Sequence, residues 1–184
     1  MIDITENIIP IPPTATALGF FDGLHLGHMK VVEECFRHDG LCPAMFTFHS
    51  DTALPKREKI ENLLTNEMKL EKLAEAGVKY IYSPDFNSVC NYTARDFIEK
   101  VLVRIMNAKV VVCGFDFRLG AGGGSNADEL KEMCREYGIE VVIIPPFSLD
   151  GCVVHSTAIK NLIKSGEIAK ANKLLGYDFS IEGK

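Results

Sequence analysis

Two histidines, His25 and His28, stand three residues apart in a segment whose chemistry suits phosphate. The segment Gly19–His28 reads G-F-F-D-G-L-H-L-G-H and joins an apolar run to a helical pattern. A helix N-terminus offers unpaired N–H groups and a partial positive charge, which favour anions. Gly23 and Gly27 would let the backbone approach a ligand closely. Two imidazoles there could donate hydrogen bonds to phosphate oxygens as charge builds up in a transition state.

The spacing of these histidines also leaves a two-histidine metal site open as an alternative. The H-E-x-x-H pattern typical of zinc enzymes does not occur in the chain. The position of H-x-G-H at a strand-to-helix turn favours phosphate binding, and what outweighs the metal alternative is the family resemblance given below.

A second candidate segment, Gly114–Gly120, reads G-F-D-F-R-L-G and follows an apolar run. Asp116 could accept hydrogen bonds from ribose hydroxyls or capture a metal ion, or it could simply cap a loop or helix. The glycine-rich stretch Ala121–Ser125 is expected to be flexible. It is not a Walker A loop, because no G-K-[ST] follows it.

A third candidate segment, Val154–Lys160, reads V-H-S-T-A-I-K and leads from a strand into a helix. Ser156 and Thr157 would make a good helix N-cap by themselves. From the residues alone, a capping role and a binding role are about equally favoured.

The elements that must position these segments alternate along the chain. Apolar runs predict strands, and apolar residues at helical spacing predict helices. Thr65 is expected to cap one helix, and Thr93 with Asp96 resembles a capping box at another. Strands are predicted at 14–21, 41–48, 78–83, 109–113 and 139–144, and helices at 28–38, 65–77, 93–105, 126–137 and, in short segments, 157–175.

This alternation implies right-handed βαβ units and an α/β fold with a mostly parallel sheet flanked by helices. Ligands of such sheets bind beyond the carboxyl ends of the strands. Since the three candidate segments each follow a predicted strand, we expect them to meet at one edge of the sheet.

The composition of the chain limits the classes of function that we expect for it. The chain has 184 residues, 47% of them hydrophobic and 24% charged, which fits one globular domain. Its net charge is −5, so we expect no nucleic-acid partner. The six cysteines show no C-x-x-C pair and are expected to be reduced thiols of a cytoplasmic protein. No signal peptide or membrane span is expected, and the oligomeric state is not predicted.

The string G-x-F-D-G-x-H-x-G-H resembles the FMN adenylyltransferase domain of bacterial bifunctional riboflavin kinase/FAD synthetases, within the nucleotidylyltransferase superfamily. The Gly114 segment is similar to the G-x-D-F-x-F-G stretch of that family, with Leu119 in place of Phe. The third segment is similar to S-S-T-x-I-R, with His155 and Lys160 in place of the first Ser and the Arg. The match extends over nearly the whole chain.

The resemblance implies a Rossmann-like sheet of the nucleotidylyltransferase type and transfer of the adenylyl group of ATP to FMN, giving FAD and diphosphate. Mg²⁺ would accompany ATP, and no metal-ligating side chains are expected. His25 and His28 would be catalytic. ATP and its phosphates would contact Gly19, Phe20, Phe21, Asp22, Gly23, Gly27, Ser156, Thr157 and Lys160, and the nucleotide and flavin pocket would include Gly114, Asp116, Phe117 and Arg118.

Departures from the family pattern keep two alternatives open. The family's acidic-Pro-His-Pro turn is here His49-Ser50-Asp51, so another small phosphate acceptor of an adenylyl- or cytidylyltransferase is one alternative. The substitutions at Leu119, Gly122–Gly124, His155 and Lys160 motivate a non-catalytic flavin- or nucleotide-binding protein as the other. Residues 1–184 are expected to form a single domain without the riboflavin kinase barrel that usually follows in the family.

Overall fold

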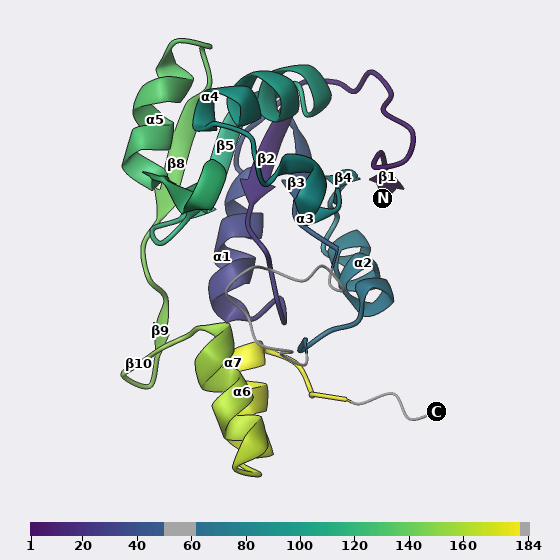
Figure 1. Ribbon diagram of the computed structural model, residues 1–184. Coiled ribbons are helices and arrows are strands. Elements are labelled where there is room, and N and C mark those ends of the chain that lie inside the picture. The colour runs from purple at the N-terminus through teal and green to yellow at the C-terminus, as the bar shows by residue number, and fades with distance from the viewer. Residues whose placement is uncertain (50–61, 181–184) are drawn as a thin grey trace.

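The computed structural model describes residues 1–49 and 62–180 of the chain. Its centre is a six-stranded sheet in the order β1-β4-β3-β2-β5-β8, and every neighbouring pair is parallel (Figure 1). The predicted α/β fold with a parallel sheet is therefore confirmed. The strands are β1 (Ile2–Asp3), β2 (Thr14–Leu18), β3 (Cys42–Phe46), β4 (Tyr80–Tyr82), β5 (Ala108–Gly114) and β8 (Glu140–Ile144).

Helices cover both faces of this sheet, and alternate strand residues face the two layers. Ala15 and Ala17 of β2 pack with α1 (Leu26–Cys35) and α2 (Asn66–Glu75). Leu18, at the end of β2, packs on the other face. That face is covered by α4 (Ala94–Phe97), the π-helical stretch η1 (Ile98–Ile105) and α5 (Ala127–Arg135). Strands buried on both faces explain why the sequence shows continuous apolar runs.

Smaller elements complete the described part of the chain. They are the short helix α3 (Phe86–Val89), the 3₁₀ turn η2 (Ala121–Gly123), the antiparallel pair β6 (Arg118–Leu119) and β7 (Ser125–Asn126), the antiparallel pair β9 (Ser148–Leu149) and β10 (Cys152–Val153), and the helices α6 (Ser156–Lys164) and α7 (Ile168–Leu175). Figure 1 shows α6 and α7 together at one end of the molecule, beyond the sheet. Within the described residues, no helix has the length and apolarity needed to cross a bilayer.

The strand order reverses direction between β2 and β5, which positions the site. From β2 the chain moves outward through β3 and β4, and it then returns to add β5 and β8 on the other side of β2. The connections after β2 and β5 therefore leave the sheet on opposite faces and open a crevice at its carboxyl edge. Open α/β sheets bind ligands at this kind of reversal.

Most predicted elements are confirmed, with shifted ends. The first strand ends at Leu18 rather than Phe21, and the φ of 53° at Phe21 lies far from the extended values of a strand. Its helix begins at Leu26, two residues earlier than predicted, because His25 serves as the N-cap. Thr65 caps α2, and Thr93 forms a capping box at α4, as predicted.

Candidate functional site

A cavity of about 1020 Å³ opens at the carboxyl edge of the sheet. The last residues of four neighbouring strands line it, namely Leu18, Phe46, Gly114 and Ile144. The three candidate segments meet there, as predicted, although the third follows β10, a strand of a separate antiparallel pair, and not a strand of the main sheet. The predicted site residues that line the cavity are Gly19, Phe20, Phe21, Asp22, His25, Gly27, His28, Gly114, Asp116, Phe117, Arg118, Ser156 and Thr157.

Gly23 and Lys160 are the two predicted site residues outside the lining that the described residues form. Gly23 is buried, and its carbonyl oxygen accepts a hydrogen bond from the Tyr177 hydroxyl at 2.6 Å. Lys160 forms an ion pair with Asp22. Both residues therefore contact the wall of the site on the side that faces away from the cavity.

The loop between β2 and α1 has an unusual backbone. Phe21, Gly23 and Leu24 all have positive φ angles, of 53°, 86° and 39°. Such conformations are costly for Phe and Leu, and they persist only where the surroundings fix them. Phe21 and Leu24 are only 1% and 3% exposed, so their packing in the core stabilises the loop. A Cβ atom at Gly23 would lie 2.6 Å from Cδ1 of Leu63, so close packing as well as φ requires glycine.

His25 closes the N-terminus of α1 with its side chain. Its Nδ1 accepts a hydrogen bond from the backbone N–H of His28 at 3.1 Å. Burial lowers the pKa of His25 from 6.5 to about 4, against a backbone hydrogen bond and the Asp22 charge, which raise it. His25 is therefore neutral at pH 7. Since Nδ1 is an acceptor, the proton lies on Nε2, and the ring can donate one hydrogen bond.

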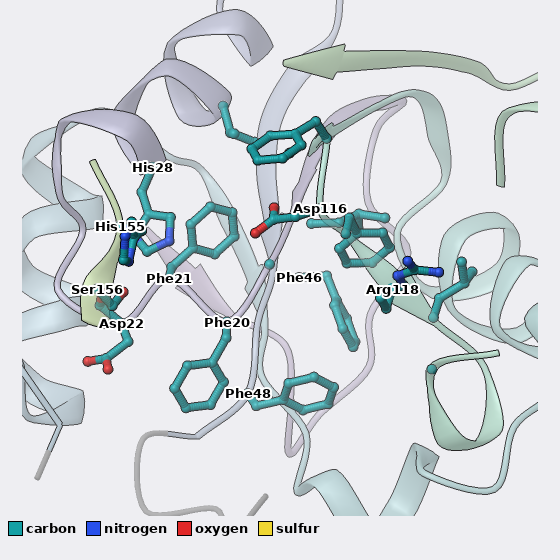
Figure 2. Close-up of a pocket in the computed structure, with 18 of the residues that line it drawn as sticks. Phe20, Phe21, Asp22, His28, Phe46, Phe48, Asp116, Arg118, His155 and Ser156 are labelled. Atoms are coloured by element: carbon teal, nitrogen blue, oxygen red, sulfur yellow. Dashed lines mark hydrogen bonds between the residues drawn. The ribbon is translucent and has the colours of Figure 1, made fainter. Parts of the chain in front are cut away.

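His28 lies directly on His25. The two rings stack with their centroids 3.6 Å apart and their planes 13° from parallel. The edge of the pair meets Phe21, whose ring centroid is 5.3 Å from that of His28. Figure 2 shows His28 and Phe21 on the same side of the cavity as His155 and Ser156. The i, i+3 spacing thus brings both imidazoles to one wall, as the sequence predicted.

The N-terminus of α6 forms the neighbouring wall. Its cap is His155, whose Nδ1 accepts a hydrogen bond from the Ala158 N–H at 3.2 Å. Of the two roles left open for Ser156 and Thr157, the N-cap role is therefore wrong, because both residues lie inside the first turn. The Ser156 hydroxyl instead donates to the carbonyl oxygen of Asp22 at 2.8 Å. This bond joins α6 to the β2–α1 loop.

The segment after β5 forms the opposite wall. Asp116 is exposed and lies near the middle of the view in Figure 2, with Arg118 further to the side. The glycine-rich stretch after it is more regular than expected. It forms the turn of the β6–β7 hairpin, with Gly122 and Gly123 at φ angles of 67° and 69°.

Several residues that line the cavity were not predicted from the sequence. Pro145, Pro146 and Phe147 follow β8, so the rule that ligands bind beyond strand ends could have found them. The α3 region, represented by Phe86 and Cys90, follows β4, so the same rule could have found it. The segment His49-Ser50-Asp51 stands where the family has its acidic-Pro-His-Pro turn. Its first residue, His49, lies against Asn66, the first residue of α2. Ser50 and Asp51 lie outside the described residues.

Comparison with known proteins connects this geometry to a family. Residues 10–158 match the family described as FAD synthetase. The bifunctional riboflavin kinase/FMN adenylyltransferase of Listeria monocytogenes is 33% identical over 174 residues, which cover 91% of this chain and 55% of that protein. The FAD synthetase of the same organism is 30% identical over 172 residues, covering 90% of this chain and 70% of that protein. The chain thus spans about half the length of the bifunctional relative.

A solved structure shares the whole described fold. It is titled a macrolide-efflux protein from Streptococcus pneumoniae, with a TM-score of 0.83 and 29% identity. The alignment covers 100% of this chain and 65% of that protein. We take from it the shared arrangement of sheet and helices.

Proposed function

The chain belongs to the FAD synthetase family, and from that premise we propose that it transfers the adenylyl group of ATP to FMN, giving FAD and diphosphate. The observation that carries the proposal is the meeting of two helix N-termini, those of α1 and α6, at one cavity beyond β2 and β5. Two such termini, with His25 and His28 between them, suit a polyphosphate. We infer from family membership that the nucleotide is ATP and that the flavin is FMN.

In the proposed reaction, a phosphate oxygen of FMN attacks the α-phosphorus of ATP. A new O–P bond forms, the bond from the α-phosphorus to the bridging oxygen breaks, and diphosphate leaves with the electron pair. The FMN phosphate is already ionised at pH 7, so the step needs no general base. His25 and His28 would donate hydrogen bonds to the transferring phosphate, where charge builds up in the transition state.

The departing diphosphate would lie at the start of α6. Ser156 and Thr157 both line the cavity, and as first-turn residues they also bring backbone N–H groups that the helix itself leaves unpaired. The loop from Gly19 through Phe20 and Gly27 would contact the rest of the triphosphate.

Mg²⁺ would enter with ATP as part of the substrate. Among residues 1–49 and 62–180, no group of three or more His, Cys, Asp or Glu side chains is placed to hold a metal ion. The ion would therefore be held mainly by phosphate oxygens, which suit this hard cation, and Asp116 is an exposed carboxylate in the lining that could join them. Bound there, Mg²⁺ would supply neutralising charge to the phosphates.

The flavin would take the aromatic side of the cavity. Phe20, Phe46 and Phe48 lie together there in Figure 2, and Gly114, Phe117 and Arg118 complete the pocket. Flat apolar side chains suit stacking against the fused rings of a flavin.

All six cysteines are free thiols, which supports a reducing, cytoplasmic setting for the enzyme.

The test is turnover of the purified protein with ATP, Mg²⁺ and FMN, followed by chromatography of the products. We expect FAD and diphosphate in equal amounts. Riboflavin should give no product, because it lacks the phosphate that attacks. Phosphopantetheine and glycerol phosphate serve as alternative acceptors.

Two results would contradict the proposal. Faster turnover with another phosphate than with FMN would assign a different acceptor. ATP or FMN binding, seen as a raised unfolding temperature without any release of diphosphate, would show a non-catalytic binding protein.

A further inference from the structure

Lys160 forms an ion pair with Asp22 inside the protein. The ammonium of Lys160 contacts Oδ2 of Asp22, and their side chains are only 13% and 2% exposed. Separating such a pair is costly, because it removes the compensation of a buried charge. The ammonium is therefore strongly held at Asp22.

Asp22 also binds two further segments of the chain. Its Oδ1 accepts a hydrogen bond from the backbone N–H of Leu63 at 2.8 Å. Its carbonyl oxygen accepts the hydroxyl of Ser156. Ser156 and Lys160 are four residues apart, so they lie on one face of α6 and both meet Asp22. This one residue thus fixes the start of α6 against the β2–α1 loop.

Asp22 belongs to the lining of the cavity, but its ion pair with Lys160 lies on the side away from the ligand space. Lys160 does not belong to the lining that the described residues form, whereas Ser156 and Thr157 do. In Figure 2 the carboxylate of Asp22 points away from Phe20 and Asp116. The ammonium on that carboxylate is therefore placed behind the wall of the cavity.

We propose that Lys160 is a positioning residue, which holds the N-terminus of α6 at the cavity through Asp22, while Ser156, Thr157 and the helix N–H groups contact the phosphates. The inference rests on the proposed function, because it takes the phosphates of ATP as the ligand. It assigns Lys160 a role that differs from direct phosphate binding, and the two roles predict opposite results in a double variant.

The experiment compares Lys160→Met, Asp22→Asn and the double variant. Asparagine keeps the oxygen that accepts from Leu63 but removes the charge. ATP affinity is measured by calorimetry without FMN, well below the unfolding temperature of each protein. We expect Lys160→Met to weaken ATP binding about tenfold or more, because the charge of Asp22 loses its ammonium partner. The double variant should recover to within about threefold of the wild type, because both charges are gone.

Lys170→Met is the matched control. Lys170 pairs with Glu167 on the surface, with side chains 70% and 42% exposed, so its loss should leave ATP affinity as in the wild type. If Lys160→Met does not fold, the double variant alone still decides, since direct phosphate binding predicts a loss that no change at Asp22 restores.

Two outcomes would overturn the inference. A double variant that unfolds like the wild type but binds ATP as weakly as Lys160→Met would make Lys160 a direct ligand. A Lys160→Met protein with a lowered unfolding temperature but wild-type ATP affinity would make the ion pair merely structural. Wild-type protein that binds ATP yet forms no FAD would count against the proposed function alone.

Discussion

At the scale of single residues, His25 and His28 differ in how deeply they are buried. His25 is buried, neutral at pH 7 and fixed in one tautomer by the His28 N–H. His28 stacks on it and is partly exposed. A neutral His25 allows this stacking, because two protonated rings at 3.6 Å would repel each other. The neutral His25 ring can thus donate a hydrogen bond without adding a charge to the wall.

The depressed pKa of His25 makes stability depend on pH. Its pKa is about 4 in the folded protein and 6.5 for a histidine exposed to water, so between these values the unfolded state binds the extra proton. Stability therefore falls as the pH is lowered from 6.5 to 4, by up to roughly 3 kcal/mol. Urea unfolding at a series of pH values measures this. The His25→Gln protein should show a flatter dependence over that range, and an equal slope in both proteins would contradict the assignment.

At the scale of elements, the β2–α1 loop depends on glycine for two separate reasons. Gly23→Ala introduces both a strained φ and a contact with Leu63, whereas Gly40→Ala introduces the strained φ alone, since nothing lies within 4 Å of its added methyl. We expect Gly40→Ala to lower the free energy of unfolding by about 1–2 kcal/mol. Gly23→Ala should lower it by about 1–3 kcal/mol more and weaken ATP binding.

Chemical denaturation and ATP titration of the two glycine variants give the comparison. Equal losses of stability, with ATP affinity kept in both variants, would show that the packing of this loop on Leu63 does not shape the site.

The elements also show what the sequence could predict. Strands such as β5 were predictable because burial on both faces demands a continuous apolar run. The site segments after β2 and β5 were predictable because they follow strands of the parallel sheet, whereas Val154–Lys160 follows β10 outside that sheet. The Asp22–Lys160 pair was not, because it joins residues 138 apart through a contact that only the packing of α6 creates. The His155 cap was missed because serine and threonine are the usual N-cap residues.

At the scale of the whole molecule, the C-terminal helices complete the site from outside the sheet. The Tyr177 hydroxyl, just after α7, donates to the carbonyl oxygen of Gly23 in the β2–α1 loop. Gly176 packs so closely on Leu26 that an added Cβ would lie 2.6 Å from its Cδ2. Residues just after α7 therefore stabilise the β2–α1 loop and the start of α1.

The distribution of thiols provides a prediction for the whole fold. Burial raises the pKa of Cys35, Cys113 and Cys134 to about 12, so these thiols should react with a disulfide reagent at pH 8 only after unfolding. Cys152 is exposed and should react first. Cys90 lines the cavity, and ATP with FMN should slow its labelling. Mass spectrometry of labelled peptides measures the order, and early labelling of Cys113 would contradict the buried core described here.

The most direct test of the account is FAD formation by the wild type and by His28→Ala, with His38→Ala as the control for loss of a histidine outside the cavity. We predict that the wild type forms FAD from ATP and FMN and that His28→Ala lowers the turnover number about 10²–10³-fold, as loss of a transition-state hydrogen bond does. His38→Ala should stay close to the wild type. Turnover of His28→Ala close to that of the wild type would contradict the assignment of this cavity as the centre of adenylyl transfer.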